Sequence, residues 1–303
     1  MVAILADGHV LIEGPPGVAK TRVVKTYAEA LGASWNRIQF VPDMMPRDIT
    51  GTLEFDSQRS ERKLIGSQLP YNLIIGDEIN RATPKLQAAL LETMEERQFT
   101  VFGQTIKMPE FFIFLATQNP FENRGTFDLP EAQLDRFLFK LRVNFPSQEN
   151  EREILKISKN EKLARLAPNQ SPVSNLITES DQETILAAQS LVLQMEAPKK
   201  IEDYILLIAA VTRQPELYDG NLPLEIKMGI GPRASQSLYL ASMAMAWLNS
   251  HSEVEISDVD AIAADVMRHR IVLSDEALIE NTSVESIINN ILSLAKKNLD
   301  GSK

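Results

Sequence analysis

The sequence contains no cysteine and only three histidines, His9, His251 and His269, which lie far apart. Without cysteine there are no disulfide bonds and no thiolate metal sites, and the scattered histidines argue against a histidine-built metal site. No apolar run approaches the roughly 20 residues of a membrane-spanning helix. The opening residues "MVAILADGHV" lack the basic start of a secretory signal. Together these absences favour a cytoplasmic protein.

An excess of positive charge is also missing, because the formal net charge of the 303 residues is −10 at pH 7. Nucleic acids and anionic membranes repel such a chain, so non-specific binding to either is disfavoured. With 44% hydrophobic and 24% charged residues, the composition is that of an ordinary globular protein. The length suits about two domains of ~150 residues each.

The two halves of the chain have different patterns, and the change comes near Pro146. Before it, nearly continuous apolar runs at 9–13, 37–41, 72–78 and 111–117 alternate with helical periodicity, as in a parallel sheet covered on both faces. After it, only helical patterns remain. We predict an α/β domain with a parallel sheet flanked by helices over residues 1–146, and a smaller all-α domain over residues 147–303.

The stretch "GPPGVAKT" lies between the first predicted strand and the first predicted helix. It matches the phosphate-binding pattern G-x-x-x-x-G-K-[ST], except that Ala19 replaces the glycine before the lysine. In this arrangement loop N–H groups and the helix N-terminus face phosphate oxygens. We predict that Lys20 reaches the β- and γ-phosphates and that Thr21 ligates Mg²⁺; the alternative is a structural turn with a surface lysine. The predicted nucleotide-binding residues are Gly14, Pro15, Pro16, Gly17, Val18, Ala19, Lys20, Thr21 and Arg22.

A second motif, "LIIGDE", ends a predicted buried strand in Asp77-Glu78. An acidic pair at such a place is costly unless it faces a ligand or a metal. Open α/β sheets bind their ligands at the carboxyl ends of their strands, so this pair and the loop are expected to meet. We predict that Asp77 holds nucleotide-bound Mg²⁺ through water and that Glu78 polarises the attacking water.

Three further stretches, "ATQNP", "GTFDLPEAQLDRFLF" and "GPRAS", follow in that order. With the two motifs above, they make nearly the whole chain resemble the MoxR family of AAA+ ATPases. The resemblance implies an AAA+ P-loop core, ATP and Mg²⁺ as cofactors, and a helical lid. It also implies insertions near 48–64 and 97–109, the second a hairpin with Phe102, Gly103 and Gln104 near its tip.

The resemblance also assigns roles to three residues beyond Lys20 and Glu78. Asn119 matches the sensor that orients the lytic water, and Arg136 matches an arginine finger supplied to a neighbouring subunit. Arg233 matches a second sensor that reaches from the lid to the γ-phosphate. Because Pro232 suits the first position of a helix, Arg233 falls in a first turn where the helix dipole disfavours a cation, and an anionic partner would relieve this.

Each assignment has a structural alternative. Asn119 either senses the nucleotide or turns the chain before Pro120. Arg136 is either the finger or an ion-pair partner of Glu131 or Asp135, and Arg124 is a second candidate for the finger.

Two other stretches stay undecided. Asn80 and Arg81 support either Glu78 or a subunit contact. The segment "RHR" at 268–270 either contacts nucleotide or a neighbour, or is a solvated helix end.

These features predict Mg²⁺-dependent ATP hydrolysis by an oligomeric ring, with a hexamer as the expected size. By resemblance, the ring acts as a chaperone that remodels or matures a partner protein, including by metal insertion, and a protein with a von Willebrand factor A domain is one expected partner. The finger in trans makes activity depend on assembly.

Three alternative functions fit the sequence less well. A nucleic-acid motor of the helicase-loader type is disfavoured, because the predicted hairpin has only Arg97 and Lys107 beside Glu95, Glu96 and Glu110. A GTPase should show an N-K-x-D motif, which is missing, and a small-molecule kinase would not need the two arginines. A nucleotide-gated module without turnover should lack the acidic pair or the finger.

Overall fold

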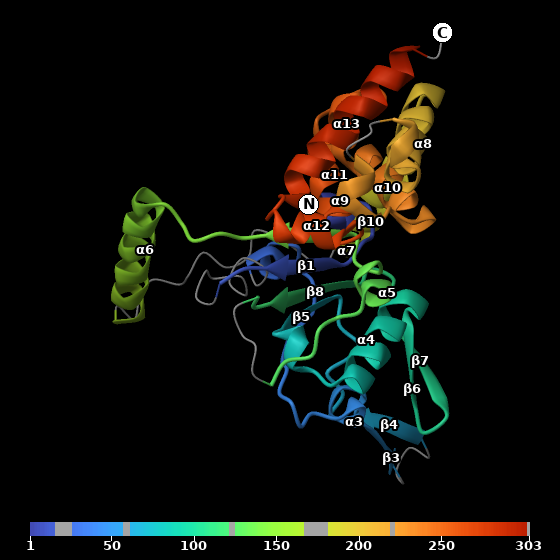
Figure 1. The fold of residues 1–303 in the computed structure, drawn as a ribbon. Helices are drawn as coiled ribbons and strands as arrows, with labels where there is room; N and C mark the ends of the chain where they lie inside the picture. The colour runs from blue at the N-terminus through green and yellow to red at the C-terminus, as the bar shows by residue number, and fades with distance from the viewer. Residues whose placement is uncertain (16–25, 57–60, 121–124, 167–180, 219–221, 302–303) are drawn as a thin grey trace.

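A five-stranded parallel sheet lies beneath a group of helices (Figure 1). The computed structural model describes residues 1–15, 26–56, 61–120, 125–166, 181–218 and 222–301. The sheet has the order β2-β5-β8-β1-β9, and all its neighbouring strands are parallel. Its strands are β1 (Val10–Glu13), β2 (Trp35–Gln39), β5 (Leu73–Asp77), β8 (Ile113–Gln118) and β9 (Phe139–Arg142).

The parallel sheet confirms the predicted fold class, and four of its strands lie at or close to the predicted runs. The central strand β5 is buried along its whole length, which explains its uninterrupted apolar sequence. The strand β9 was not predicted, because Lys140 and Arg142 break its apolar pattern. These cations form ion pairs with Glu13 and Glu285.

The helices of the core begin and end at residues with recognisable capping roles. Residues 26–30 are helical, and Gly32, with φ of 57°, follows that helix in the left-handed conformation that glycine adopts readily. Helix α4 (Pro84–Glu96) begins at the predicted proline, and the Thr83 side chain accepts a hydrogen bond from the Leu86 N–H. The shorter elements are α1 (Val2–Leu5), α3 (Pro46–Thr50), η1 (Ile79–Arg81) and α5 (Glu131–Leu134).

Two antiparallel hairpins extend from the side of the core that lies away from the lid (Figure 1). The first consists of β3 (Thr52–Asp56) and β4 (Glu61–Ile65), and the second of β6 (Gln98–Val101) and β7 (Gln104–Lys107). Phe102 and Gly103 form the turn of the second, with φ of 47° and 78°. Two successive positive φ values suit the tight turn of a twisted hairpin.

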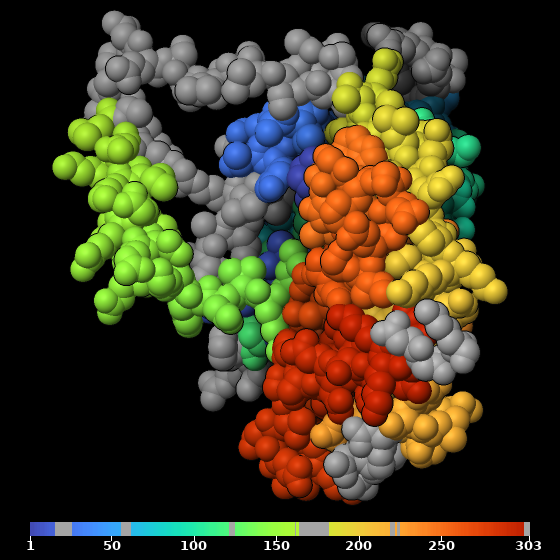
Figure 2. All heavy atoms as spheres, turned by 90° about the horizontal axis from the view of Figure 1, so that it is seen from above, coloured from blue at the N-terminus to red at the C-terminus, as the bar shows by residue number. Residues whose placement is uncertain are grey.

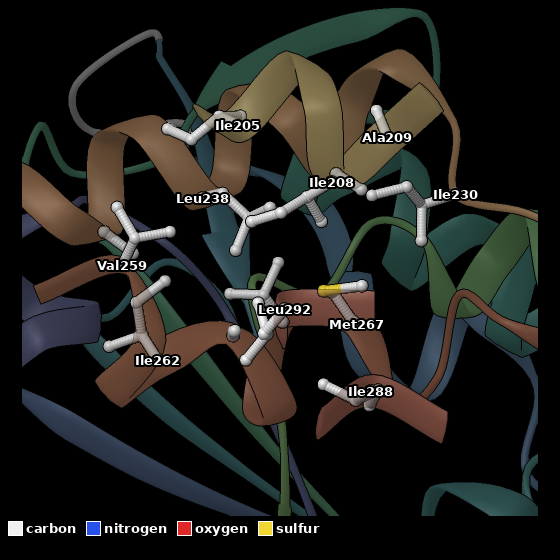
Figure 3. Close-up of a cluster of buried hydrophobic side chains, with 14 of the residues drawn as sticks. Ile205, Ile208, Ala209, Ile230, Leu238, Val259, Ile262, Met267, Ile288 and Leu292 are labelled. Carbon is white, nitrogen blue, oxygen red and sulfur yellow. The ribbon is translucent and has the colours of Figure 1, made fainter. Parts of the chain in front are cut away.

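The helices from Asp181 onward form a helical lid (Figures 1 and 3). Ile208, Leu238, Val259, Met267 and Ile288 meet in its core and are fully buried. A short antiparallel pair, β10 (Ile226–Met228) with β11 (Val272–Leu273), lies among the helices, and the all-α prediction missed it. The helices are α7 (Asp181–Val192), α8 (Lys199–Arg213), α9 (Leu222–Glu225), α10 (Pro232–Leu248), α11 (Ile256–Met267), α12 (Asp275–Ile279) and α13 (Val284–Gly301), with a 3-10 turn, η2 (Pro215–Leu217).

The core of the lid continues onto one face of the sheet. Val10, Ile12 and Phe139 of β1 and β9 belong to the same buried cluster as Leu238 of α10. This shared core holds the lid against the β1–β9 side of the sheet. Helix α6 (Gln148–Leu166), in contrast, stands apart from both the sheet and the lid (Figures 1 and 2). The predicted boundary at 146 falls between β9 and α6.

Candidate active site

Four of the predicted site residues gather at the carboxyl edge of the sheet. Asp77 is the last residue of β5 and Glu78 follows it, while Gly14 and Asn119 directly follow β1 and β8. Since these strands are parallel, their ends share one edge. A Cβ atom at Gly14 would lie 2.4 Å from the Val143 carbonyl oxygen, so only glycine fits there. The remaining loop residues, 16–22, which include Lys20 and Thr21, and also Arg124, lie outside the described residues.

Asp77 is held by two polar side chains, although it is only 6% exposed. The Arg37 Nε donates to Asp77 Oδ2 at 2.6 Å, and the Thr117 hydroxyl donates to Oδ1 at 3.3 Å. The same hydroxyl accepts from the Glu78 N–H at 3.1 Å. Neither Arg37 nor Thr117 stands out in the sequence, because both contact Asp77 from neighbouring strands.

Glu78 has φ of 59° and ψ of 52°, the left-handed conformation that non-glycine residues seldom adopt. Such backbone strain concentrates at functional sites, where the surroundings enforce it. The Gln39 Nε2 donates to Glu78 Oε2 at 2.9 Å, and Arg81 Nε lies 3.1 Å from the same oxygen. Gln39 was not predicted; its signal is the alternation along β2 that puts it on the same face as Arg37.

Asn119 is buried, with 5% of its surface exposed. The Asn80 amide donates to the Asn119 carbonyl oxygen at a long 3.5 Å, and the Asn80 carbonyl accepts from the Phe127 N–H at 2.6 Å. These bonds join Asn80 to Asn119 and Phe127 and involve neither member of the acidic pair, so both alternatives for Asn80 stay open. The sensor role of Asn119 stays a prediction.

The edge offers oxygen ligands of the kind that Mg²⁺ prefers. Among the described residues, no group of three or more His, Cys, Asp or Glu side chains is placed to hold a metal ion by itself. Mg²⁺ in phosphate sites is typically held by one or two carboxylates, the phosphates and water. Asp77 lies on the same edge as Gly14, where the predicted phosphate-binding loop begins, with β8 between their strands, and it fits an ion that arrives with a nucleotide.

A second cluster contains Arg136, the predicted arginine finger, and Arg233, the predicted sensor of the lid. Arg136 Nη2 lies 3.0 Å from Glu95 Oε2, and Arg233 donates to the other oxygen of the same carboxylate. Arg233 also lies 3.7 Å from Asp135 Oδ2. Pro232 is indeed the first residue of α10, and Glu95 is an anionic partner for the cation in that first turn. Arg136 pairs with Glu95 and not with the predicted Glu131 or Asp135.

This arginine cluster, Arg136 and Arg233 on Glu95, lies at the amino edge of the sheet. Leu138, two residues after Arg136, donates its N–H to the His9 carbonyl oxygen at 2.8 Å, just before β1 begins. At about 3.3 Å per residue, His9 and Gly14 at the two ends of β1 are roughly 16 Å apart. The structure therefore groups Arg136 with Arg233 and separates both from Asp77 and Glu78.

The cluster borders a cavity of about 340 Å³. His9, at one wall, is buried; its Nε2 donates to the Met94 carbonyl oxygen at 3.2 Å and its Nδ1 accepts from the Phe114 N–H at 3.0 Å. Burial lowers the pKa of His9 to about 4. The ring is therefore neutral at pH 7 and connects α4 to β8.

The segment 268–270 is not a solvated helix end. The Arg270 side chain is only 2% exposed and the Arg268 side chain 9%. His269 is buried as well, and its Nε2 donates to the Phe137 carbonyl oxygen at 3.0 Å. This segment therefore joins the lid to the chain around Arg136.

Comparison with known proteins agrees with this two-part architecture. One family model, described as the ATPase family associated with various cellular activities (AAA), matches residues 9–139, and an AAA lid domain model matches residues 223–291. "Chaperone MoxR1" of Mycobacterium tuberculosis is 39% identical over 96% of this chain and 75% of its own length. The protein YeaC of Bacillus subtilis is 38% identical over 98% of this chain and 87% of its own length.

A crystal structure of a candidate ATPase from Cytophaga hutchinsonii has the same fold. It superposes with a TM-score of 0.85 at 34% identity, covering 96% of this chain and 86% of the other. None of the described helices combines the length and the apolar character needed to span a bilayer.

Proposed function

Since this chain belongs to the MoxR family of AAA ATPases, we propose that it binds ATP with Mg²⁺ and hydrolyses it at the carboxyl edge of the sheet. The observation that carries the proposal is the grouping of Asp77, Glu78 and Asn119 at this edge, with Glu78 in a left-handed conformation. A purely structural turn after β5 would not need a strained acidic residue.

The chain's own residues orient the reaction. Gln39 and Arg81 hold the Glu78 carboxylate, which accepts a hydrogen bond from the attacking water and polarises it. Asp77, through water, and Thr21 would hold the nucleotide-bound Mg²⁺. When bound, Mg²⁺ neutralises charge on the phosphates, and Lys20 adds a second positive charge there.

Arg136 and Arg233 serve the nucleotide of a neighbouring subunit. Both lie at the amino edge, about 16 Å along β1 from the edge where their own subunit begins its phosphate-binding loop. They share Glu95, so the pair stays together while no phosphate is present. A γ-phosphate presented by a neighbour is a competing anion for both cations, and it would bind them through charge-assisted hydrogen bonds.

A ring of subunits would bring the carboxyl edge of one subunit to the amino edge of the next. We propose that this ring has six subunits and that it works in the cytoplasm. We propose that hydrolysis in this ring remodels or matures a client protein, in the manner that the name of the chaperone relative suggests. More specifically, we propose that maturation of the client includes metal insertion and that one partner of the ring contains a von Willebrand factor A domain.

The two hairpins are the proposed client-binding surface. Phe55 on β3 and Phe102 at the β6–β7 turn expose 65% and 76% of their surface, so both offer apolar contacts. The predicted hairpin cation Arg97 is engaged at the base, with the Asp7 carboxylate and the Glu110 carbonyl oxygen. This leaves the turn itself apolar and favours a protein client over a nucleic-acid strand.

The test is the ATPase rate as a function of protein concentration, with sedimentation on the same samples, with and without ATP and Mg²⁺. We expect the rate per subunit to rise as an oligomer forms. A rate that stays constant on a monomer would mean that neither arginine acts in trans, and an absent rate would favour a gated binding module.

A further inference from the structure

We infer that Arg270 is a positioning residue that sets the geometry of the Arg136–Arg233 pair. This inference rests on the proposed function of that pair. It concerns a residue of the lid that touches neither the carboxyl edge nor the Glu95 carboxylate.

The Arg270 guanidinium is surrounded by the backbone on both sides of Arg136. Its Nη2 donates to the carbonyl oxygens of Asp135 and Phe137 at 3.0 and 2.7 Å, and its Nη1 donates to that of Leu138 at 3.2 Å. Its Nε donates to Asp135 Oδ1 at 2.7 Å. The carbonyls before and after Arg136 thus point at one cation, which fixes the direction in which the Arg136 side chain leaves the backbone.

The same guanidinium also contacts the helix that carries Arg233. Nη2 lies 3.3 Å from the hydroxyl of Ser237, one turn after Arg233 on α10. Nη1 donates to the Val266 carbonyl oxygen at 2.5 Å, which ties the group to the end of α11. One side chain therefore links the two segments that present Arg136 and Arg233, and it fixes their separation.

Because Arg270 is buried, losing any of the hydrogen bonds from its guanidinium to these carbonyl oxygens is costly. With only 2% of the side chain exposed, water cannot replace a lost donor at these carbonyls. Desolvation lowers the pKa of Arg270, and the Asp135 carboxylate opposes that change. A lysine would keep the charge, but its single ammonium cannot form the planar array of donors that the carbonyls require.

The experiment compares Arg270→Lys with Arg268→Lys in the full chain. Arg268 is a matched control: it lies two residues away, is 9% exposed, and also donates to a carbonyl of the core, but at Lys140. Because small displacements of reacting groups reduce turnover strongly, we expect Arg270→Lys to lower kcat by about tenfold or more, with the KM for ATP unchanged. Arg268→Lys should retain kcat within about twofold, since it leaves the carbonyls around Arg136 in place.

Two readouts separate positioning from general damage. Mixing Arg270→Lys subunits with Glu78→Gln subunits should restore turnover. The Arg270→Lys subunit keeps an intact acidic edge with Glu78, and the Glu78→Gln subunit supplies a correctly placed arginine pair to its neighbour. In a background that lacks both Arg136 and Arg233, Arg270→Lys should change kcat by less than about twofold, as expected when residues act through one another.

Thermal melts show whether each variant is folded at the assay temperature. If Arg270→Lys does not fold, Asp135→Asn replaces it. This substitution removes the negative charge that pairs with Arg270 and leaves a side-chain oxygen that can still accept its hydrogen bond. A folded variant of either kind with wild-type kcat overturns the inference, while the proposed function survives if Arg136→Ala still lowers kcat. A lowered kcat that mixing does not restore also overturns it. If Arg136→Ala keeps full activity, both this inference and the trans role of the arginines fail.

Discussion

The two edges of the central sheet carry opposite chemistry. The carboxyl edge presents the acidic pair Asp77 and Glu78, whereas the amino edge presents Arg136 and Arg233 on Glu95. The strands between them are only four to six residues long, but even this length separates the groups by about 16 Å. One chain therefore holds two complementary parts of the proposed hydrolytic site that cannot meet within it.

The edges also differ in how their groups are held. Glu78 is oriented within the sheet, by its own strained backbone and by Gln39 on the adjacent strand. The two arginines are oriented by contacts between distant segments, through Glu95 and through Arg270 of the lid. We therefore expect the acidic edge to keep its geometry in an isolated subunit, and the arginine edge to depend on how the lid sits.

The largest expected effect comes from removing the finger. Arg136→Ala should lower kcat by about 10³-fold while ATP still binds, because the finger stabilises charge that develops only in the transition state. Steady-state ATPase assays and nucleotide-binding titrations measure the two quantities. Arg97→Ala, which borders the same cavity, is the control and should retain turnover. Comparable losses in the two variants would mean that the cavity, and not the finger, matters.

At the opposite edge, Glu78→Gln should lower kcat by about 10²-fold or more with ATP affinity retained, because the amide cannot polarise the attacking water. Glu92→Gln, on an exposed position of α4, is the matched control. Unchanged turnover in Glu78→Gln would remove Glu78 from the reaction.

Mixing these two variants tests the comparison itself. Arg136→Ala and Glu78→Gln subunits should together regain part of the activity, since one supplies the acidic edge and the other the arginine edge. Activity that stays absent at every mixing ratio would place both residues in the same site of one chain.

A smaller effect is expected for Gln39→Leu. It removes the amide that donates to Glu78 Oε2 and should lower kcat by about threefold without changing the KM for ATP, because Glu78 keeps its backbone conformation and loses one contact. Gln98→Leu, at an exposed position of β6, serves as the control. An increase in kcat would show that Gln39 restrains Glu78 instead of positioning it.

The smallest effect at neutral pH is expected for the stability contribution of His9, which lines the same cavity as Arg136 and Arg233. Its pKa is about 4 in the folded protein, against 6.5 as the ordinary value, so the unfolded chain binds more protons between these values. Stability should therefore fall as the pH is lowered from 6.5 to about 4, by up to about 3 kcal/mol from this group. Denaturant titrations across this range should show a shallower pH dependence for His9→Gln. An identical dependence would mean that His9 is not buried as a neutral ring.

Several features of the fold followed from the sequence because their causes are local. The buried strand that ends in Asp77, the start of α4 at Pro84 and the start of α10 at Pro232 could be predicted from neighbouring residues alone. The strand β9 could not, since Lys140 and Arg142 are tolerated only because Glu13 and Glu285 lie beside them.

The sequence by itself determined the fold class and the grouping at the carboxyl edge, because the ends of parallel strands must share one edge of a sheet. Only the tertiary structure decided that Arg37 and Gln39 face the acidic pair, and that Glu95 holds Arg136 together with Arg233. The partners in these contacts lie far apart along the chain, and their meeting depends on strand register and on the docking of the lid. No local pattern in the sequence encodes the strand register or the docking of the lid.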